Sequence, residues 1–394
     1  MSPRVCHVIT CLELGGAQEN TLHTVRTLRS PFQAGLLAGP GGMLDDEARR
    51  TVEVEFVPSL VRPIRPWRDL QAIADLAGRF RRLAPDIVHT HSSKAGIVGR
   101  LAARAAGVPI VVHSIHGFGW NDRQPAVVRG ALIAAERLVA PLTTHFIAVS
   151  RAHLSRGAAL GVVAPERASL IRSGVRLAEF AAAGADRAAA RAALRGELGL
   201  AARARIVGMV ACLKPQKAPL DFVAAAARVA AAHPDAHFVM VGDGALRAAV
   251  ETAADAAGLG GRLHLLGWRR DIPRLTAAFD VVALTSHWEG LPRVVPEAIA
   301  AGRPIVATAV DGTAEILHDG DNALVAPAGD VEAIAARLAR LLDSPELGAA
   351  LVDRARSLLA EFDIDAMVRS QEALYGRLLE GRPERRPDQD LRAA

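Results

Sequence analysis

Residues 285–325 read TSHWEGLPRVVPEAIAAGRPIVATAVDGTAEILHDGDNALV, and this stretch decides the fold class. The apolar run at 280–284 predicts a strand, the segment after Pro292 predicts a helix ending near Gly302, and residues 304–307 predict the next strand. Pro292 suits the first turn of that helix, where a missing N–H group costs nothing. A strand, loop, helix and strand in this order form a parallel α/β unit, in which ligands bind at the carboxyl ends of the strands.

Two glutamates flank the predicted start of this helix. Glu289 lies in the loop, and Glu297 follows Pro292 by five residues, which is roughly 7.5 Å along a helix. That length suits the step from a diphosphate to the ribose of a nucleotide, and N–H groups near Arg293 and Val294 predict an anion site. The alternative is a pair of surface glutamates beside an ordinary helix start.

The same alternation of strand and helix runs through both halves of the chain. Strands are predicted in the first half at residues 5–10, 86–89, 109–115 and 145–149, and in the second half at 206–210, 236–241 and 263–266. Helices are predicted at residues 18–28, 66–83, 219–232, 245–257, 331–342 and 345–360, with Ser150 capping another. This order predicts an α/β fold with parallel, doubly wound sheets and helices on both faces.

A chain of 394 residues exceeds one typical core, so two domains are expected. We predict an N-terminal domain at 1–180, a C-terminal domain at 181–362 and a last helix at 363–380 that packs back on the N-terminal domain. Met367, Leu374, Tyr375 and Leu378 lie on one side of that helix. Residues 381–394 are charged and interrupted by proline, which predicts disorder.

Composition narrows the class of protein. The three cysteines, Cys6, Cys11 and Cys212, have no metal-ligand spacing and suggest reduced thiols in a cytosolic protein. No run of about 18 uncharged apolar residues occurs, so no spanning segment is expected. Residues 1–180 hold 22 Lys and Arg against 14 Asp and Glu, a net charge of +8, whereas the remainder holds 25 against 28, a net charge of −3.

The basic first half suits an anionic acceptor or an anionic membrane surface, and a solvated basic face without a partner is the alternative. Nucleic acid is not expected, because aromatic residues do not interleave with the basic ones. The predicted helix at 66–83 turns Leu70, Ile73, Ala77 and Phe80 toward the core. The membrane candidates in and beside it are Arg62, Arg65, Arg68, Arg79, Arg81 and Arg82, together with Trp67.

The segment EGLPRVVPEAIAAGRPIVAT, with Glu289 and Glu297 separated by seven residues, resembles the signature of the retaining family 4 glycosyltransferases. These enzymes have two facing Rossmann-like domains, the GT-B architecture, and the similarity covers about residues 4–380. The resemblance implies that Glu297 binds the donor ribose and that Glu289 contacts hydroxyls of the donor sugar. It places the donor diphosphate against the backbone of the loop and helix start, at Gly290, Leu291, Arg293 and Val294.

The resemblance also assigns cations and glycines to the donor site. Two of the three lysines of the chain, Lys214 and Lys217, follow the strand at 206–210, where they would face the diphosphate. The family usually has an arginine where this chain has Cys212, and Lys214 would replace it. Gly242 and Gly244 follow the strand at 236–241 and would line the nucleotide. A tight turn is the alternative for Gly15 and Gly16, which follow the first predicted strand.

In the first domain, the resemblance places Gly16 beside the donor diphosphate and His116 beside the donor sugar. It places Gln18, His91, Ser92 and Lys94 on the acceptor side. Zinc is the alternative reading of His89 and His91, but no further ligand stands near them in the sequence, so no metal site is expected. The Asp319-Gly320-Asp321 turn and the Asp363-Ile364-Asp365 helix start are not expected to bind metal either.

The resulting prediction is a retaining, metal-independent hexosyltransferase that needs no cofactor. It would move a sugar from a nucleotide-diphosphate donor, favoured as a UDP-sugar over GDP-mannose, to a glycan or polyprenyl-diphosphate-linked acceptor in surface polysaccharide synthesis. The catalytic residues would be His116, Glu289 and Lys217. The predicted location is cytoplasmic, peripheral on the inner face of the cell membrane. The alternatives are a nucleotide-sugar 2-epimerase and a non-catalytic subunit that binds sugar nucleotides.

Overall fold

The computed structural model describes residues 2–381, and the chain divides into two compact units. The first unit contains the described residues up to His113, Pro141–His145 and the residues from Asp365 onward. The second contains Ser114–Ala140 and Phe146–Ile364. The domain boundaries that the sequence suggests, at residues 180 and 362, stay predictions.

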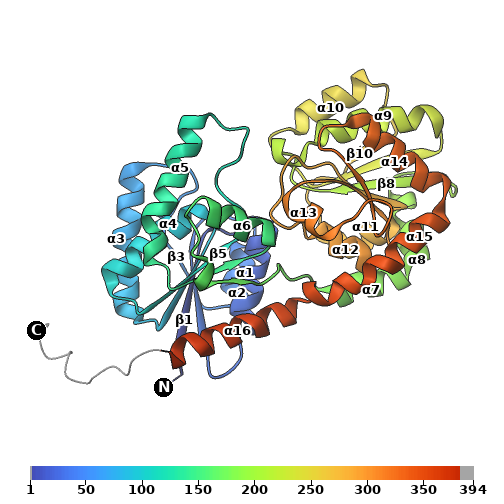
Figure 1. Cartoon of the computed structure of the whole chain (residues 1–394). Helices are drawn as coiled ribbons and strands as arrows, with labels where there is room; N and C mark the ends of the chain where they lie inside the picture. The colour runs from blue at the N-terminus through green and yellow to red at the C-terminus, as the bar shows by residue number, and fades with distance from the viewer. Residues whose placement is uncertain (1, 382–394) are drawn as a thin grey trace, which may run out of the picture. The chain divides into compact units, whose positions relative to one another are not determined.

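The first sheet has seven strands in the order β3-β2-β1-β4-β5-β6-β7, as Figure 1 shows in part, and β1 pairs in parallel with β2 and with β4. By the division above, β7 and the residues of β6 from Phe146 onward belong to the second unit. The strands are β1 (Arg4–Cys11), β2 (Gln33–Gly39), β3 (Val54–Phe56), β4 (Ile87–His91), β5 (Ile110–Ile115), β6 (His145–Ala148) and β7 (Ala168–Leu170). The helices among them are α1 (Gly16–Thr27), α2 (Asp45–Thr51), α3 (Pro66–Leu83), α4 (Ser93–Ala106), α5 (Ala126–Val139) and α6 (Arg151–Ala159).

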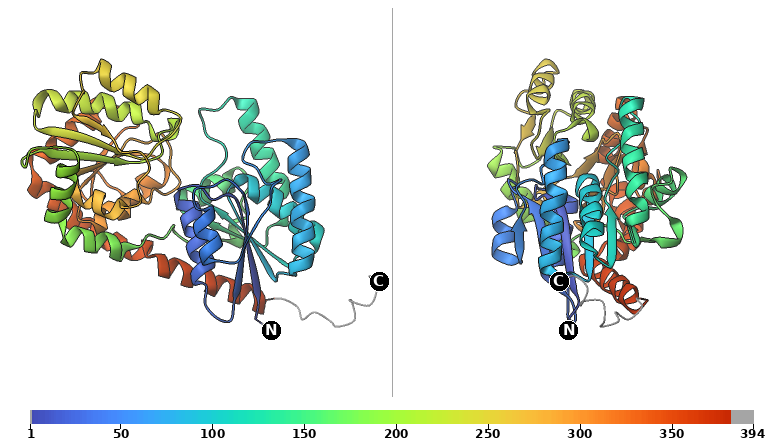
Figure 2. Two further views of the ribbon diagram at one scale, coloured as in Figure 1. Left: turned by 180° about the vertical axis from the view of Figure 1, so that it is seen from behind. Right: turned by 90° about the vertical axis from the view of Figure 1, so that its left-hand side faces the viewer.

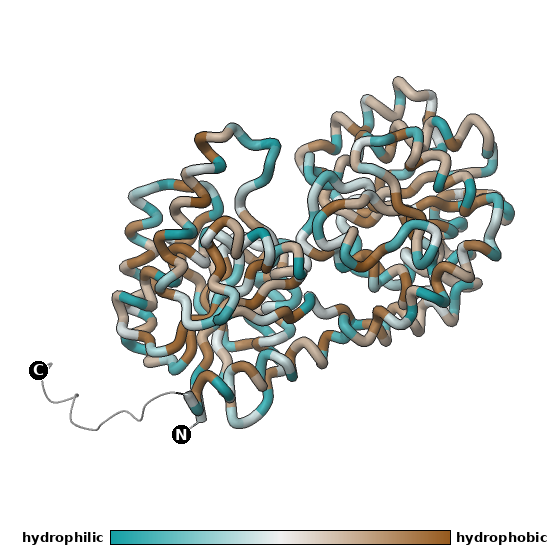
Figure 3. Tube along the Cα trace, in the orientation of Figure 1, coloured by the Kyte–Doolittle hydropathy of each residue, from teal (hydrophilic) through white to brown (hydrophobic). Residues whose placement is uncertain are grey.

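Alternating side chains of β1 fill the cores on the two faces of this sheet. Cys6 and Val8 pack with buried residues of α3 and α4, such as Leu76 and Val98. Ile9 packs on the other face, with Leu22 of α1 and its neighbours. Because both faces are covered, the strand is apolar along most of its length, as the sequence of a buried parallel strand requires. Figures 2 and 3 show the helical layers and the apolar strands between them.

The second sheet has six strands in the order β10-β9-β8-β11-β12-β13, and the pairings within it are parallel. The strands are β8 (Arg205–Val210), β9 (Ala236–Val241), β10 (Leu263–Leu265), β11 (Val281–Leu284), β12 (Ile305–Thr308) and β13 (Leu324–Ala326). The helices are α7 (Leu177–Ala185), α8 (Arg187–Glu197), α9 (Pro219–Ala232), α10 (Arg247–Ala256), α11 (Ile272–Ala278), α12 (Val294–Ala300), α13 (Asp311–Ile316), α14 (Val331–Asp343) and α15 (Pro345–Ala355).

This sheet is also a layer between two cores. Val282 and Leu284 of β11 pack with residues of α8, α11 and α12, whereas Val281 and Ala283 pack with residues of α9 and α14. The predicted parallel, doubly wound architecture is therefore confirmed in both sheets. It brings the loops after β8, β9, β11 and β12 to one edge of the second sheet, where the carboxyl ends of neighbouring strands meet.

The last described helix, α16 (Ile364–Glu380), belongs from Asp365 onward to the first unit, as predicted. Met367, Leu374 and Tyr375 are buried, and Leu378 is partly buried. The hydroxyl of Tyr375, which is 0% exposed, lies 2.5 Å from Nδ1 of His89 in β4. This hydrogen bond ties the helix to the sheet. Of the predicted disordered tail, residues 382–394 lie outside the described residues.

Two local predictions are wrong. Helix α12 begins at Val294, and Pro292 lies before it, where its carbonyl accepts a hydrogen bond from the N–H group of Val295 at 3.2 Å. Leu70 in α3 is 58% exposed and does not face the core, although Ala77 and Phe80 do.

Within residues 2–381 no helix is both long enough and apolar enough to cross a bilayer.

Candidate active site

A buried carboxylate occupies the loop that follows β11. Glu289 is 5% exposed, and its Oε1 lies 2.5 Å from Nζ of Lys217 and 2.5 Å from the hydroxyl of Ser286. The backbone N–H group of Glu289 donates to the carboxylate of Asp311 at 3.0 Å. A buried charge is stable only when it is paired and hydrogen-bonded, and Lys217 with Ser286 meets that condition. The carboxylate is thus held in one orientation.

Lys217 comes from the loop after β8, which continues into the short helix η3 (Pro215–Lys217). Backbone contacts join this loop to the one after β11. The hydroxyl of Thr285 donates to the carbonyls of Lys217 at 3.0 Å and Ala218 at 3.1 Å, and the N–H group of His287 donates to the carbonyl of Gln216 at 2.8 Å. Because β8 and β11 are neighbours in the sheet, the pairing of Lys217 with Glu289 follows from the strand order.

Gly242 and Gly244, which follow β9, pack against backbone atoms that leave no room for a Cβ atom. A Cβ atom on Gly242 would lie 2.0 Å from the carbonyl oxygen of Ala211, and one on Gly244 would lie 2.5 Å from that of Leu213. Gly242 also has a φ of 127°, in the region that favours glycine. The turn after β9 therefore lies directly on the loop that carries Lys214. This contact explains both glycines without a ligand, while their predicted role in nucleotide binding stays a prediction.

Gly290 also permits a close backbone approach. A Cβ atom there would lie 2.2 Å from the carbonyl oxygen of His116 and 3.0 Å from the ring of His153. His116 directly follows β5, and His153 lies in α6, whose start is capped by Ser150 as predicted. Both imidazoles have a pKa lowered to about 4, mainly because burial disfavours the charged form. They are therefore neutral at pH 7.

The first turn of α12 carries the second predicted glutamate. Glu297 is 8% exposed, and its Oε1 lies 3.5 Å from Nη2 of Arg293. The side chains of Leu291 and Val294 are each 8% exposed and belong to the hydrophobic core. Any contact of these two residues with a donor would therefore use the backbone.

The residues predicted on the acceptor side lie in the first unit and differ in accessibility. Ser92 has a φ of 66°, which is uncommon for serine, and its hydroxyl lies 2.9 Å from that of Thr10. Lys94 pairs with Asp69 at 2.6 Å. The imidazole of His91 is 2% exposed, so it lies in the interior, whereas Gln18 is partly exposed in α1, which begins at Gly16. An uncommon backbone angle such as that of Ser92 is often found at functional sites.

The structure adds a third imidazole to the two histidines of β4. Nδ1 of His7 in β1 lies 3.0 Å from Nε2 of His91, and single ring nitrogens of His7, His89 and His91 all lie within 4.8 Å of one another. The premise that His89 and His91 lack a further possible ligand nearby is therefore wrong. His7 is hydrogen-bonded to His91, and His89 is hydrogen-bonded to Tyr375, in keeping with the need of polar groups inside a core for internal partners.

Sequence reasoning missed Ser286, Asp311 and His153. Ser286 stands only three residues before Glu289, and its position in the loop after a strand was the available signal. Asp311, with a φ of 36°, is an uncommon non-glycine residue in the left-handed region, which a sequence does not reveal. His153 is 37 residues beyond His116 in the chain, so only the fold brings both to Gly290.

Comparison with known proteins gives a consistent result over almost the whole chain. Residues 190–358 match the family described as "Glycosyl transferases group 1", and residues 10–174 match the "Glycosyl transferase 4-like domain". The chain is 32% identical over 377 residues to an Escherichia coli enzyme, UDP-Gal:alpha-D-GlcNAc-diphosphoundecaprenol alpha-1,3-galactosyltransferase, and the match covers 94% of this chain and 96% of the relative.

A further sequence relative and a solved structure are also similar to this chain. A D-inositol 3-phosphate glycosyltransferase of Mycolicibacterium gilvum is 31% identical over 331 residues, which cover 78% of this chain and 69% of the relative. Among solved structures, Anabaena HepE in complex with UDP and glucose is similar with a TM-score of 0.81 and 21% identity, over 95% of this chain and 100% of that one. At that identity the likeness shows the fold alone.

Proposed function

We propose, on the premise that the chain belongs to the retaining family 4 glycosyltransferases with the GT-B fold, that it transfers a hexose from a UDP-sugar to a polyprenyl-diphosphate-linked sugar. Galactose is the donor sugar that we favour, and surface polysaccharide synthesis is the process. The observation that carries the proposal is the match over 94% of the chain to an enzyme named for this reaction. The buried Lys217–Glu289 pair lies in the loops where the proposal needs a donor site.

The proposed chemistry starts from the charge that develops when the nucleoside diphosphate departs. A cation held in a fixed place stabilises such a charge without reorganising in the transition state. Lys217 is held by its contact with Glu289, and we assign it this role, with Lys214 supporting it. The carboxylate of Glu289 would accept hydrogen bonds from hydroxyls of the donor sugar, and Glu297 would accept one from the ribose.

His116 is assigned to the donor sugar. Its imidazole is neutral at pH 7, because burial holds its pKa near 4. A neutral imidazole can donate one hydrogen bond and accept another, which suits a sugar hydroxyl better than an imidazolium, which only donates. The alternatives from the sequence, a 2-epimerase and a non-catalytic subunit, gain no specific observation here.

A membrane surface is the proposed place of reaction for a lipid-linked acceptor. Ile64 lies just before α3, whereas Trp67 and Leu70 lie in its first five residues, and the three are 72%, 84% and 58% exposed. Arg65 and Arg68 flank them. An exposed tryptophan among arginines is typical of a protein segment that rests in the interface of an anionic bilayer. Thus the predicted basic surface also has an apolar part.

The experiment that tests the function combines donor and acceptor. Purified protein is incubated with UDP-galactose and a synthetic diphosphate lipid bearing N-acetylglucosamine, and UDP release is measured with and without the acceptor. Acceptor-dependent UDP release together with a disaccharide product supports the proposal. A new nucleotide sugar without acceptor supports an epimerase instead, and binding of UDP-galactose with neither product supports the non-catalytic subunit.

A further inference from the structure

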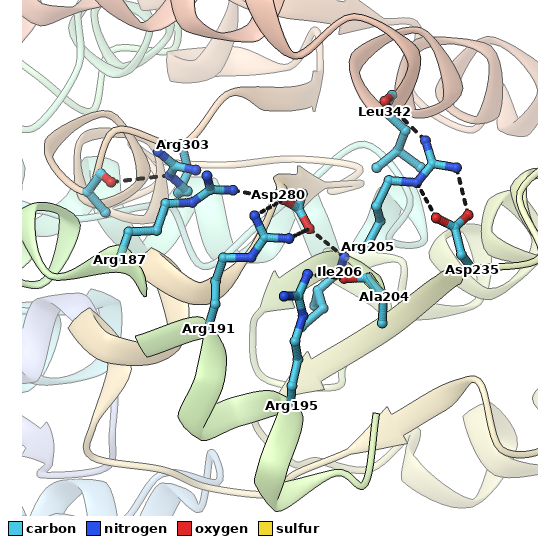
Figure 4. A network of polar contacts seen from close by, with 11 residues as sticks. Arg187, Arg191, Arg195, Ala204, Arg205, Ile206, Asp235, Asp280, Arg303 and Leu342 are labelled. Atoms are coloured by element: carbon cyan, nitrogen blue, oxygen red, sulfur yellow. Dashed lines mark hydrogen bonds and ion pairs between the residues drawn. The ribbon is translucent and has the colours of Figure 1, made fainter. Parts of the chain in front are cut away.

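Four arginines surround a single carboxylate in the second unit (Figure 4). Arg187, Arg191 and Arg195 follow one another at intervals of four along α8, and therefore share one side of that helix. Arg303 comes from the loop before β12, and Asp280 directly precedes β11. We call these five residues the arginine cluster.

Asp280 is fully used by its existing partners. Its Oδ1 accepts from Nη2 of Arg187 at 2.7 Å and lies 3.1 Å from Nη1 of Arg191. Its Oδ2 accepts from the N–H group of Ile206 at 2.8 Å and from Nη2 of Arg191 at 3.2 Å. One negative charge is thus shared by two guanidinium groups and a backbone donor.

The other two arginines of the cluster have only neutral acceptors. Arg195 donates from Nη2 to the carbonyl of Ala204, and Arg303 donates from Nε to the carbonyl of Ala301 at 3.3 Å. Within the described residues, neither pairs with a carboxylate at ion-pair distance. Four positive charges therefore meet one negative charge in a partly buried place.

Arg205, also drawn in Figure 4, is an arginine with a carboxylate partner of its own. Its Nε donates to Oδ2 of Asp235 at 2.9 Å and its Nη2 donates to Oδ1 at 2.7 Å, and hydrogen bonding to Asp235 raises its pKa. In the arginine cluster the shifts are in the opposite direction. Burial first, and then repulsion from Arg187, lower the pKa of Arg303 to about 10. The pKa of Arg187 and of Arg195 is lowered by burial and then by Arg191.

The arginine cluster also has more hydrogen-bond donors than acceptors, just as it has more positive than negative charges. The Nε atoms of Arg187, Arg191 and Arg195 are buried and have no hydrogen-bond partner among the described residues. Buried polar groups normally have partners, so three such atoms in one cluster indicate that acceptors are in short supply. The side chains of Arg187 and Arg191 are still 32% and 22% exposed, so the arginine cluster is partly open to solvent.

The cluster lies away from the proposed donor site. Asp280 and Ile206 stand at the amino ends of β11 and β8, whereas Glu289 and Lys217 follow the carboxyl ends of the same strands. A strand advances about 3.3 Å per residue, so the two edges of the sheet are separated by roughly 15–20 Å. The arginine cluster therefore does not serve the reacting diphosphate.

We propose that the arginine cluster is a binding site for a phosphate dianion, held mainly by Arg187, Arg191 and Arg303. Guanidinium groups bind phosphate oxygens in a bidentate geometry, and a tetrahedral dianion offers acceptors in several directions at once. A dianion would offset most of the excess positive charge. The phosphate can be a free ion or the headgroup of an anionic lipid, because both present the same oxygens.

The first test measures binding of inorganic phosphate by the whole chain. Calorimetry and thermal unfolding are run with phosphate against chloride at matched pH and ionic strength. Phosphate should bind and raise the melting temperature, whereas chloride should not. Arg303→Gln, which breaks no ion pair, should weaken phosphate binding about tenfold or more. Arg228→Gln is the matched control, because Arg228 lies exposed on α9 and its side chain is 49% exposed.

A second readout separates the site from a mere structural role. Without phosphate, Arg303→Gln should raise the melting temperature, because it removes an uncompensated positive charge, whereas a structural arginine would lower it when removed. Equal phosphate binding by wild type and Arg303→Gln overturns the proposal, as does an absence of phosphate binding. Arg187→Gln, which removes another of the three proposed phosphate ligands, serves as the second variant should Arg303→Gln unfold.

The source of the phosphate is settled with vesicles. Vesicles of phosphatidylcholine with phosphatidic acid are compared with vesicles of phosphatidylcholine alone. Binding to phosphatidic acid that Arg303→Gln abolishes and free phosphate inhibits assigns a lipid headgroup. Binding of free phosphate without this vesicle binding assigns the free ion. Both results support the site, and the failure of both overturns it. None of these readouts depends on glycosyl transfer.

Discussion

Nζ of Lys217 lies 2.5 Å from Oε1 of Glu289, and the two residues come from loops at the carboxyl ends of neighbouring strands. The side chain of Glu289 is 5% exposed and that of Lys217 is 19% exposed, so water screens the pair only weakly. The same contact that stabilises the buried carboxylate also fixes the position of the cation. Stability and the proposed catalysis therefore depend on one pair.

Replacing Lys217 should lower both the rate of sugar transfer and the stability of the protein. Lys217→Met is expected to lower kcat by about 10² or more, because it removes a preorganised charge from the departing diphosphate. It also leaves the buried Glu289 carboxylate without its cation, at a cost of roughly 3–5 kcal/mol in the free energy of unfolding. UDP release and urea unfolding measure the two effects. Transfer at the wild-type rate by Lys217→Met would show that the assigned role is wrong.

The double variant Lys217→Met/Glu289→Gln separates the two effects. It leaves no charge buried at this position, because glutamine keeps the shape of glutamate and is neutral. We expect it to recover part of the unfolding free energy lost in Lys217→Met but none of the activity. Recovery of activity along with stability would mean that the single variant had failed only through misfolding.

Glu297 and Glu289 should differ in the step that they affect. Glu297→Ala is expected to weaken UDP binding by about 1.5–3 kcal/mol, typical of a hydrogen bond to a charged group. Glu289→Ala should mainly lower turnover. Calorimetry with UDP and steady-state kinetics distinguish the two, with Glu332→Ala as a control, since the Glu332 side chain is 83% exposed. The donor assignment fails when both variants bind UDP and transfer sugar as the wild type does.

Transfer should survive chelation. Both aspartates of the Asp319-Gly320-Asp321 turn are engaged by arginines, since Asp319 pairs with Arg337 at 3.1 Å and Asp321 lies 3.5 Å from Arg354. Asp319 also accepts a hydrogen bond from the N–H group of Val325 at 2.7 Å. The electrostatic work is assigned to Lys217 instead. We therefore expect unchanged UDP release in EDTA, and a loss that Mn²⁺ or Mg²⁺ restores would contradict the mechanism.

Acid should destabilise the protein in a defined pH range. Burial lowers the pKa of His7 to about 3 and that of His116 and His153 to about 4, against about 6.5 in an unfolded chain. Between these values the unfolded state binds more protons than the folded state, so stability is complete above pH 6.5 and falls as pH drops toward 4. Each such histidine contributes about 1.4 kcal/mol per pH unit in that range.

Urea unfolding at intervals from pH 5 to pH 8 measures this slope. His153→Gln should flatten the slope relative to the wild type, because one fewer proton is taken up on unfolding. His318→Gln is the control, since the hydrogen bonds that the structure shows for His318 involve its backbone N–H and carbonyl groups. An identical slope in wild type and His153→Gln would show that His153 ionises normally in the folded protein.

The sequence predicts the fold well where the pattern is long and local. Residues 219–232 and 236–241 coincide with α9 and β9, because a fourteen-residue helix and a strand that is apolar except for His237 leave a clear pattern. The strands β3, β7 and β13 have three residues each and were not predicted, although β10, of the same length, was. Their place is set by pairing with neighbouring strands.

The candidate site shows the same division. Glu289 and Glu297 were found because the segment that carries them resembles a family signature, and Lys217 because it closely follows the predicted strand at 206–210. The hydrogen bonds that hold Glu289 were not found, since Asp311 reaches it only through the neighbouring strand β12 and an uncommon backbone angle. His7 and His91 are 84 residues apart and meet because β1 and β4 are adjacent. Proximity that arises from strand order cannot be read from either segment alone.

Membrane association of the first unit is the remaining prediction, and the structure changes which residues should carry it. Arg62 pairs with Glu13 at 2.8 Å, and Arg79 and Arg82 share the carboxylate of Glu55, so two carboxylates offset part of the charge of these three candidate arginines. Arg65 and Arg68, beside the exposed Trp67 and Leu70, form the better contact. Each arginine near an anionic surface contributes about 1 kcal/mol, and salt screens this attraction.

Liposome flotation at low and high salt tests this contact. Wild-type protein should float with anionic vesicles at low salt, less so at high salt, and little with neutral vesicles. Trp67→Ser and the double variant Arg65→Gln/Arg68→Gln should each reduce flotation, because one removes the apolar contact and the other the charge. Met43→Ser is the matched control, since Met43 is also an exposed apolar residue of the first unit, at 43%. Equal flotation with anionic and neutral vesicles at low salt would rule out the electrostatic contact, and the transferase assignment would stand without it.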